Sequence, residues 1–306
     1  MRAAAVFLAP RFKQPGTTSC SQGNANSEFH NLLARKTGLW HHCPAYNLTA
    51  YLQQRERLAE RSLYMSDINT IGILGYPDCS EQDTITPLEI LKGAALVLGQ
   101  KLNPLPLPAG TKPQDLTVQL VSLNPGNVKM QMGTLVTPDA VLADQTFDML
   151  YVPGGVGSGA MSQNQRVLDL IRRHYQSGKV VASNCSGVGI LFRAGILGKT
   201  PVTCVAGIVG RLRELGANVP DPRRMWRGVP DARLWTTTGS YGVNGSTVAL
   251  VSHYFGKDVA GLTVSTMFDT LGGIGQDAFE LIGPEFHTYS AVEAQLQSFW
   301  GPKLLP

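Results

Sequence analysis

The residue with the clearest chemical potential is a cysteine at position 185. It follows a short apolar run, residues 180–182, and precedes small residues that lead into a helical pattern. The run predicts a buried parallel strand, and the small residues predict a sharp turn that pushes the sulfur out of the sheet. The next helix would place its partly positive N-terminus beneath the sulfur and favour a thiolate. We therefore expect Cys185 to be a nucleophile; the competing interpretation is a buried core cysteine.

A pair of glycines follows another predicted strand. Residues 149–152 are apolar, Gly154 and Gly155 come next, and an amphipathic helical pattern begins after them. Such a turn can direct backbone N–H groups into a crevice, where they stabilise a developing anion. Two alternatives stay open: a phosphate-binding loop, although no G-x-G-x-x-G or Walker pattern is present, and an ordinary strand-to-helix turn.

A carboxylate follows the first predicted strand, residues 71–75. Asp83 lies just before a Leu- and Ala-rich helix that the sequence predicts to begin at about Pro87. Proline suits the first turn of a helix, and an aspartate before it can act as an N-cap or as a carrier of protons. Glu89 is the rival carboxylate, but we expect it to lie along the helix surface.

The three segments together resemble the ThiJ/PfpI superfamily, the cysteine branch of the class I glutamine amidotransferase-like fold. The resemblance covers about residues 68–285 and rests on D-T-I-T-P (83–87), Y-V-P-G-G-V-G (151–157) and S-N-C-S-G (183–187). The sequence is most similar to the isonitrile hydratase group, which has an aspartate before its first helix and a hydroxyl residue after its cysteine. The resemblance implies that Cys185 attacks, Asp83 holds water and shuttles protons, Ser186 orients the water, and amides near Gly155 and Ser186 stabilise charge.

The sequence also departs from that family. Where the family often has T-T-H-W, this chain has residues 202–205, V-T-C-V, and Thr203 and Cys204 are taken with Gly154 and Gly239 as substrate-binding residues. No histidine stands beside Cys185, which disfavours protease-type Cys–His chemistry. The leading function is a cofactor-free isonitrile hydratase. The alternatives are a glyoxalase or deglycase acting on small carbonyls, and a non-enzymatic cysteine redox sensor.

The order of predicted elements indicates the fold class. Strands alternate with helices, which predicts a doubly wound, mostly parallel sheet with helices on both faces, of the flavodoxin-like type. Residues 128–136 are expected to form a ribbon at its edge. Ligands of such sheets bind outside the carboxyl ends of the strands, where Cys185, the glycine turn and Asp83 are predicted to meet.

Composition excludes several functional classes. The 306-residue chain has 43% hydrophobic and 16% charged residues, a net charge of +4 and five cysteines. No basic stripe suggests nucleic acid, no apolar run suits a membrane span, and the cysteine spacing predicts neither disulfides nor a metal site. We expect a cytoplasmic homodimer that acts on a small molecule without a cofactor.

Four segments are predicted along the chain. Residues 1–45 are a disordered or targeting extension, with mitochondrial targeting as one interpretation. Residues 46–66 form an amphipathic helix, residues 67–290 the catalytic domain, and residues 291–306 a C-terminal tail. His41, His42 and Cys43 could ligate a metal, but a fourth ligand is not evident.

Overall fold

The computed structural model describes residues 68–101, 107, 111–142, 145–268, 279–286 and 290–306. Every described residue belongs to one compact unit, Arg57–Pro306. The predicted extension 1–45, the predicted helix 46–66 and the His41, His42 and Cys43 cluster lie outside the described residues.

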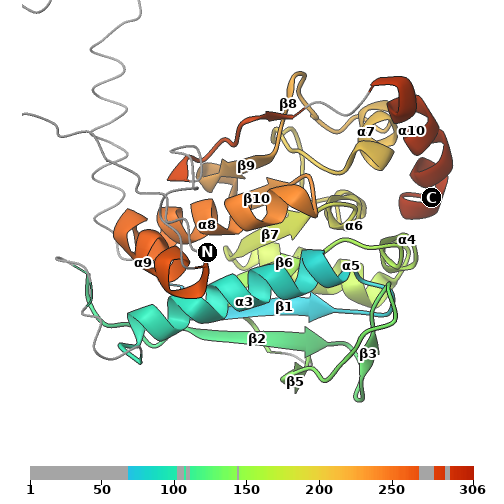
Figure 1. Ribbon diagram of the computed structural model, residues 1–306. Coiled ribbons are helices and arrows are strands. Elements are labelled where there is room, and N and C mark those ends of the chain that lie inside the picture. The colour runs from blue at the N-terminus through green and yellow to red at the C-terminus, as the bar shows by residue number, and fades with distance from the viewer. Residues whose placement is uncertain (1–67, 102–106, 108–110, 143–144, 269–278, 287–289) are drawn as a thin grey trace, which may run out of the picture. The chain divides into compact units, whose positions relative to one another are not determined.

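A seven-stranded sheet forms the centre of the described unit (Figure 1). Its strand order is β5-β2-β1-β6-β7-β10-β9, and every neighbouring pair is parallel except β10 with β9. This confirms the predicted mostly parallel sheet. The strands are β1 (Thr70–Gly75), β2 (Thr117–Ser122), β5 (Ala140–Val141), β6 (Met149–Val152), β7 (Val180–Asn184), β9 (Trp226–Val229) and β10 (Leu234–Thr237).

Two small antiparallel pairs lie outside this sheet. The expected ribbon at residues 128–136 is a separate hairpin of β3 (Val128–Lys129) and β4 (Leu135–Val136). The second pair joins β8 (Arg223–Arg224) to β11 (Glu285–Phe286).

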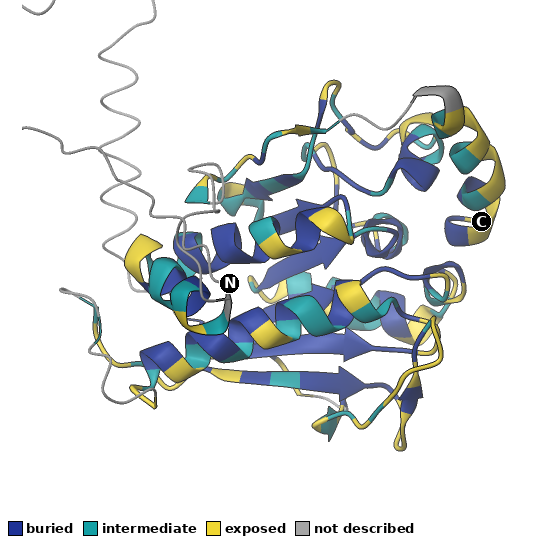
Figure 2. Cartoon of the chain, viewed as in Figure 1, coloured by how far each residue is buried: buried dark blue, intermediate teal, exposed yellow. Residues whose placement is uncertain are grey.

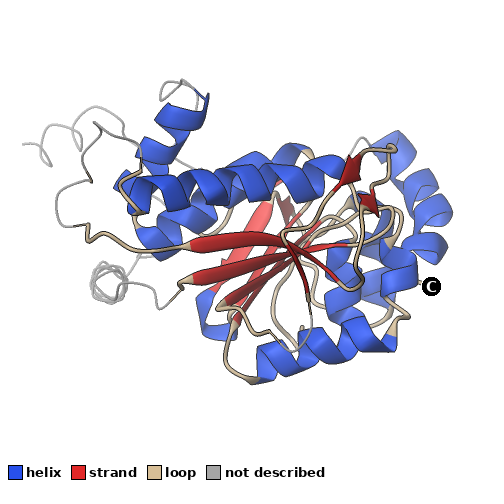
Figure 3. Ribbon diagram, turned by 90° about the horizontal axis from the view of Figure 1, so that it is seen from below, coloured by secondary structure: helices blue, strands red, loops and turns tan. Residues whose placement is uncertain are grey.

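Helices cover both faces of the sheet (Figure 3). One face carries α3 (Glu81–Leu98), α8 (Tyr241–Phe255) and α9 (Lys257–Phe268), which contact one another; the other carries α5 (Gln165–Gln176) and α6 (Gly187–Arg193). Because strand side chains alternate between faces, Ile73 packs in the cluster below α3 and its neighbour Leu74 packs in the opposite cluster. Figure 2 shows the central strands almost entirely buried.

Helix α3 begins six residues earlier than the sequence predicts. Ser80 caps it at Glu81, so Asp83 lies inside the first turn and Pro87 lies inside the helix. A proline has no N–H to donate to the carbonyl four residues before it, here that of Asp83. The side chain of Asn184 donates to this carbonyl instead, at 2.8 Å. This tertiary hydrogen bond explains why the helix continues through the proline.

The C-terminal segment is a helix, so the prediction of a tail at 291–306 is wrong. Helix α10 (Ser290–Leu304) packs along α7 (Ala206–Glu214), and the short α4 (Ser158–Met161) lies near its end (Figure 1). The remaining element is the 3-10 helix η1 (Pro230–Ala232). Within the part of the chain that the structure describes, no helix combines the length and apolarity needed to cross a membrane.

Candidate active site

Cys185 occupies a sharp turn between β7 and α6. Its φ is +51°, in the left-handed region that non-glycine residues rarely adopt, and its N–H donates to the carbonyl of Thr237 at 3.0 Å. Such a conformation costs about 1–3 kcal/mol and persists only where the surrounding structure enforces it. The predicted elbow is therefore present, with the side chain directed away from the strand into a cavity.

Glycines on two other loops leave room for this turn. A Cβ atom added to Gly154 would lie 2.5 Å from Cβ of Cys185, and one added to Gly239 would lie 2.6 Å from the same atom. Neither distance is sterically allowed, so both loops need glycine in order to enclose the nucleophile. The two predicted substrate-binding glycines thus contact Cys185 without lining the cavity.

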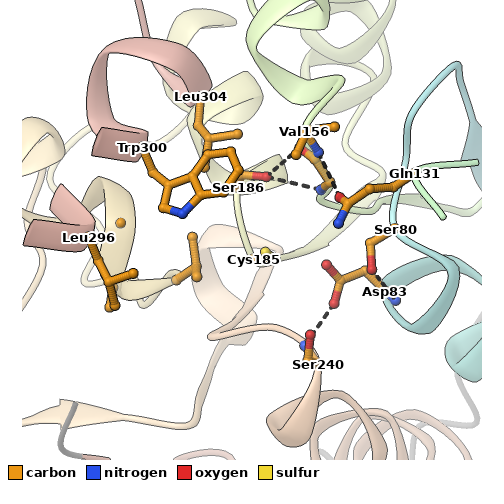
Figure 4. Close-up of a pocket in the computed structure, with 14 residues that line it drawn as sticks. Ser80, Asp83, Gln131, Val156, Cys185, Ser186, Ser240, Leu296, Trp300 and Leu304 are labelled. Carbon is orange, nitrogen blue, oxygen red and sulfur yellow. Dashed lines mark hydrogen bonds between the residues drawn. The ribbon is translucent and has the colours of Figure 1, made fainter. Parts of the chain in front are cut away.

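Asp83 faces the same cavity from the first turn of α3 (Figure 4). Its side chain is buried, with 1% of its surface exposed, and its Oδ1 accepts from the N–H of Ser240 at 2.8 Å. Its Oδ2 is equally buried and has no hydrogen-bond partner among the described residues. One carboxylate oxygen is thus held in place and the other is available to a ligand. Glu89 is exposed, as expected.

Burial governs the protonation of this pair. It raises the pKa of the Asp83 carboxyl, although the Ser240 N–H lowers that pKa in part. Burial, followed by the negative charge of Asp83, raises the pKa of the Cys185 thiol well above its ordinary value, and the Ser186 N–H only partly offsets this. Both effects oppose the thiolate that the N-terminus of the seven-residue helix α6 is expected to favour.

The amides of the glycine turn are already engaged within the protein. The Gly154 N–H donates to Oδ1 of Asn184 at 2.8 Å, and the Gly155 N–H donates to Oγ of Ser186 at 3.0 Å. The Ser186 hydroxyl also donates to the Gly155 carbonyl at 2.9 Å. The Ser186 hydroxyl therefore holds the glycine loop in place. The family resemblance predicts a different role for this hydroxyl, namely to orient water. The Val156 N–H donates at 2.9 Å to Oε1 of Gln131, a side chain on the cavity wall.

The cavity has a volume of about 200 Å³. Four predicted site residues line it: Asp83, Gly155, Cys185 and Ser186. Sequence reasoning missed the rest, which come from loops and from α7 and α10. They are Ser80, Gln131, Val156, Val205, Ala206, Gly207, Ser240, Leu296, Trp300 and Leu304.

Thr203 and Cys204 do not line the cavity, contrary to expectation. The Thr203 hydroxyl donates to the carbonyl of Arg224 at 2.6 Å, and Cys204 is fully buried in the core. The next two residues, Val205 and Ala206, take the place beside Cys185, because the chain enters α7 there. The sequence prediction therefore differs from the structure by two residues.

The part of the chain described by the structure contains no cluster of three or more His, Cys, Asp or Glu side chains suited to a metal ion. Its histidines 174 and 253 lie away from the cavity. His174 bonds to the carbonyl of Val180, and His253 packs between Trp235 and Tyr254. Of the described residues that line the cavity, Cys185 and Asp83 are the two with titratable side chains.

Comparison with known proteins identifies the family. The model of the DJ-1/PfpI family matches residues 70–244. The chain belongs to this family. An isonitrile hydratase of Pseudomonas putida is 28% identical over 193 residues, which span 63% of this chain and 75% of the relative. The glutathione-independent glyoxalase DJR-1.2 of Caenorhabditis elegans is 29% identical over 92 residues, which span 29% of this chain and about half, 49%, of that relative.

A solved structure confirms the DJ-1/PfpI fold. The crystal structure of a ThiJ/PfpI family protein from Pseudomonas syringae superposes with a TM-score of 0.58 at 17% identity, covering 79% of this chain and 90% of the other. In this DJ-1/PfpI chain the family match ends at residue 244, so α10 and its three cavity-lining side chains lie beyond it.

Proposed function

We propose that the chain hydrates isonitriles to N-substituted formamides, with Cys185 as nucleophile and Asp83 as proton carrier. The observation that carries the proposal is the free Oδ2 of Asp83, which is buried and unpartnered at the wall of the cavity that holds Cys185. A hydration needs a water molecule and a group that moves protons, and a buried carboxylate whose pKa is raised by burial can bind water and exchange protons with it.

The reaction balances without a cofactor. The Cys185 thiol adds to the terminal carbon of the isonitrile. Its sulfur bonds to that carbon, and Asp83 transfers the thiol proton to the same carbon, which gives a thioimidate. Water then adds to the carbon–nitrogen double bond, with its oxygen on carbon and one proton delivered through Asp83 to nitrogen. Cleavage of the carbon–sulfur bond returns a proton to Cys185 and releases the formamide.

The N–H groups of the glycine turn are not free to stabilise a developing charge, because both already have side-chain partners. The N–H groups of Gly154 and Gly155 bond to Asn184 and Ser186, so they serve to position the loop. In this mechanism charge at the reacting centre is met by the Ser186 N–H, and by the Val156 N–H once substrate displaces Gln131. Ser186 and Gly155 therefore act mainly by holding the elbow.

A glyoxalase activity on small carbonyls is the second candidate, favoured by the nematode relative. A redox sensor is the third, in which the Cys185 thiol is oxidised reversibly. One panel separates them: formamide release from cyclohexyl isonitrile, loss of methylglyoxal, and mass gain with peroxide.

The panel compares the wild-type chain with Cys185→Ser. Formamide release by the wild type, absent in the variant, supports the hydratase. Methylglyoxal loss without formamide supports the glyoxalase and rules out the hydratase. A mass gain with neither turnover supports the sensor.

A further inference from the structure

One wall of the cavity is a single face of helix α10. Leu296, Trp300 and Leu304 recur at intervals of four residues, so their side chains lie on one side of the helix. Figure 4 shows these three side chains on one side of Cys185 and Asp83 with Ser80 on the other. The cavity is therefore two-sided, with polar groups near the nucleophile and an apolar wall facing them.

The position of this wall is fixed by several contacts. A Cβ atom added to Gly207 of α7 would lie 2.9 Å from Cβ of Trp300, so the two helices meet closely beside the cavity. Arg223, buried with 5% of its side chain exposed, pairs with Glu293 of α10 at 3.3 Å. The Arg223 guanidinium also lies 5.0 Å above the ring of Phe286. These contacts hold helix α10 in place as one wall of the cavity.

The charge of the cavity restricts what can bind. Among the described residues that line it, Asp83 is the only one with a charged side chain. A substrate bearing a carboxylate or phosphate would meet no cation there and would be repelled by Asp83. A neutral molecule with an apolar substituent would instead bury that substituent against Trp300 and its neighbours.

We propose that α10 sets the substrate class of this site: small neutral molecules whose electrophilic carbon reaches Cys185 and whose bulky apolar substituent packs against the α10 wall. Trp300 is the main specificity-determining residue, because its side chain is the largest on the wall. The inference rests on the proposed function only for the identity of the reacting group. The shape and charge of the cavity carry the choice of substituent.

The test uses Cys185 alkylation, which does not depend on turnover. Two chloroacetamides with the same reactive carbon, N-methyl and N-cyclohexyl, are reacted with the full chain, and the rate at Cys185 is followed by peptide mapping. In each, sulfur displaces chloride from carbon and the thiol proton passes to solvent. The pKa of the thiol cancels in the ratio of the two rates, and N-acetylcysteine gives the ratio for a free thiol.

We expect the wild-type chain to favour the N-cyclohexyl probe by at least about tenfold over the free-thiol ratio, the scale of discrimination in an apolar pocket. Trp300→Ala should bring the ratio close to that of the free thiol, and Trp300→Leu should give an intermediate value. Val292→Ala is the matched control: Val292 is an apolar residue of α10, 37% exposed, and does not line the cavity.

A wild-type ratio equal to that of the free thiol overturns the inference, as does a loss of selectivity in Val292→Ala equal to that in Trp300→Ala. If Trp300→Ala does not fold, Trp300→Leu and Leu296→Ala decide the matter by the same ratio. The proposed function is judged separately. If the chain selects the N-cyclohexyl probe but hydrates no isonitrile, the proposed function is wrong and the inference about α10 stands. If alkylation is unselective but isonitrile is hydrated, the proposed function stands and the inference about α10 is wrong.

Discussion

The side-chain amide of Asn184 donates a 2.8 Å hydrogen bond to the main-chain carbonyl of Asp83, 101 residues away in sequence. That carbonyl lacks its helical donor because position 87 is proline. Oδ1 of the same Asn184 side chain accepts from the Gly154 N–H. One buried amide thus joins the strand that leads to the nucleophile, the helix that carries the carboxylate and the glycine turn.

Replacing Asn184 should therefore destabilise the domain. Asn184→Ala removes the partners of the buried Asp83 carbonyl and Gly154 N–H, and each such loss costs about 1–3 kcal/mol. We expect the free energy of unfolding, measured in urea, to fall by at least about 2 kcal/mol. Asn244→Ala, an exposed change in α8, should stay within about 0.5 kcal/mol. Equal losses of unfolding free energy in both variants would show that the Asn184 hydrogen bonds do not stabilise the domain.

Cys185 should be the first of the three described cysteines to react. It lines the cavity, whereas Cys79 and Cys204 are fully buried. The pKa of each thiol is raised by burial, with that of Cys204 raised to about 12, so access decides the order. Limiting iodoacetamide at neutral pH followed by peptide mapping tests this. Preferential labelling of Cys79 or Cys204 would contradict the assignment of Cys185 as the nucleophile.

The carboxylate should control the pH at which Cys185 reacts. Burial and the charge of Asp83 both raise the thiol pKa, so alkylation of the wild type should rise only above the ordinary thiol range. Asp83→Asn removes the charge and leaves the burial, so its pH–rate profile should move to lower pH. Glu89→Gln, at an exposed position on the same helix, should leave the profile in place. A shift to higher pH in Asp83→Asn would contradict the electrostatic argument.

Most of the sheet could be predicted from the sequence, because buried parallel strands are short continuous apolar runs. Residues 149–152 were predicted as a strand and are β6, and residues 71–75 match β1 to within one residue. The start of α3 was not predictable in this way. Pro87 follows the rule for a first helical position, and only the tertiary bond from Asn184 permits it inside the helix.

The polar half of the site followed from sequence motifs, and the apolar half did not. Cys185, Asp83, Ser186 and Gly155 stand at the ends of predicted elements, so the fold class brings them together. Trp300 and Leu296 belong to a helix that contains Gly301 and Pro302, which weaken its sequence pattern. The docking of that helix depends on contacts with α7, and no local signal in the sequence indicates them.

Asp83 should be essential to the proposed turnover, whereas Glu89 should not. Asp83→Asn keeps the size of the side chain but cannot carry a proton, and we expect isonitrile turnover to fall by at least about a hundredfold. Glu89→Gln should retain activity close to that of the wild type. Formamide release at saturating cyclohexyl isonitrile measures both. If the two variants exchange severity, the wrong carboxylate of this helix has been assigned.

The contact between Gly239 and Cys185 allows backbone strain to be separated from steric exclusion at the nucleophile. Gly239 has a φ of +112°, and a Cβ atom there would lie 2.6 Å from Cβ of Cys185. Gly178 also has positive φ, +82°, but a Cβ atom there would meet nothing within 4 Å. Gly178→Ala should therefore lose only the cost of strain, about 1 kcal/mol, in the free energy of unfolding.

Gly239→Ala should lose at least twice as much free energy of unfolding, because the cost of the steric clash adds to the backbone strain. The alkylation rate of Cys185 should also change in Gly239→Ala, whereas in Gly178→Ala it should stay at the wild-type value. Urea unfolding and iodoacetamide kinetics on the two variants measure both effects. If both variants lose the same free energy of unfolding and the alkylation rate is unchanged, the Gly239 loop does not constrain the turn at Cys185. In that case the left-handed conformation of Cys185 would have to be maintained by the Gly154 side alone.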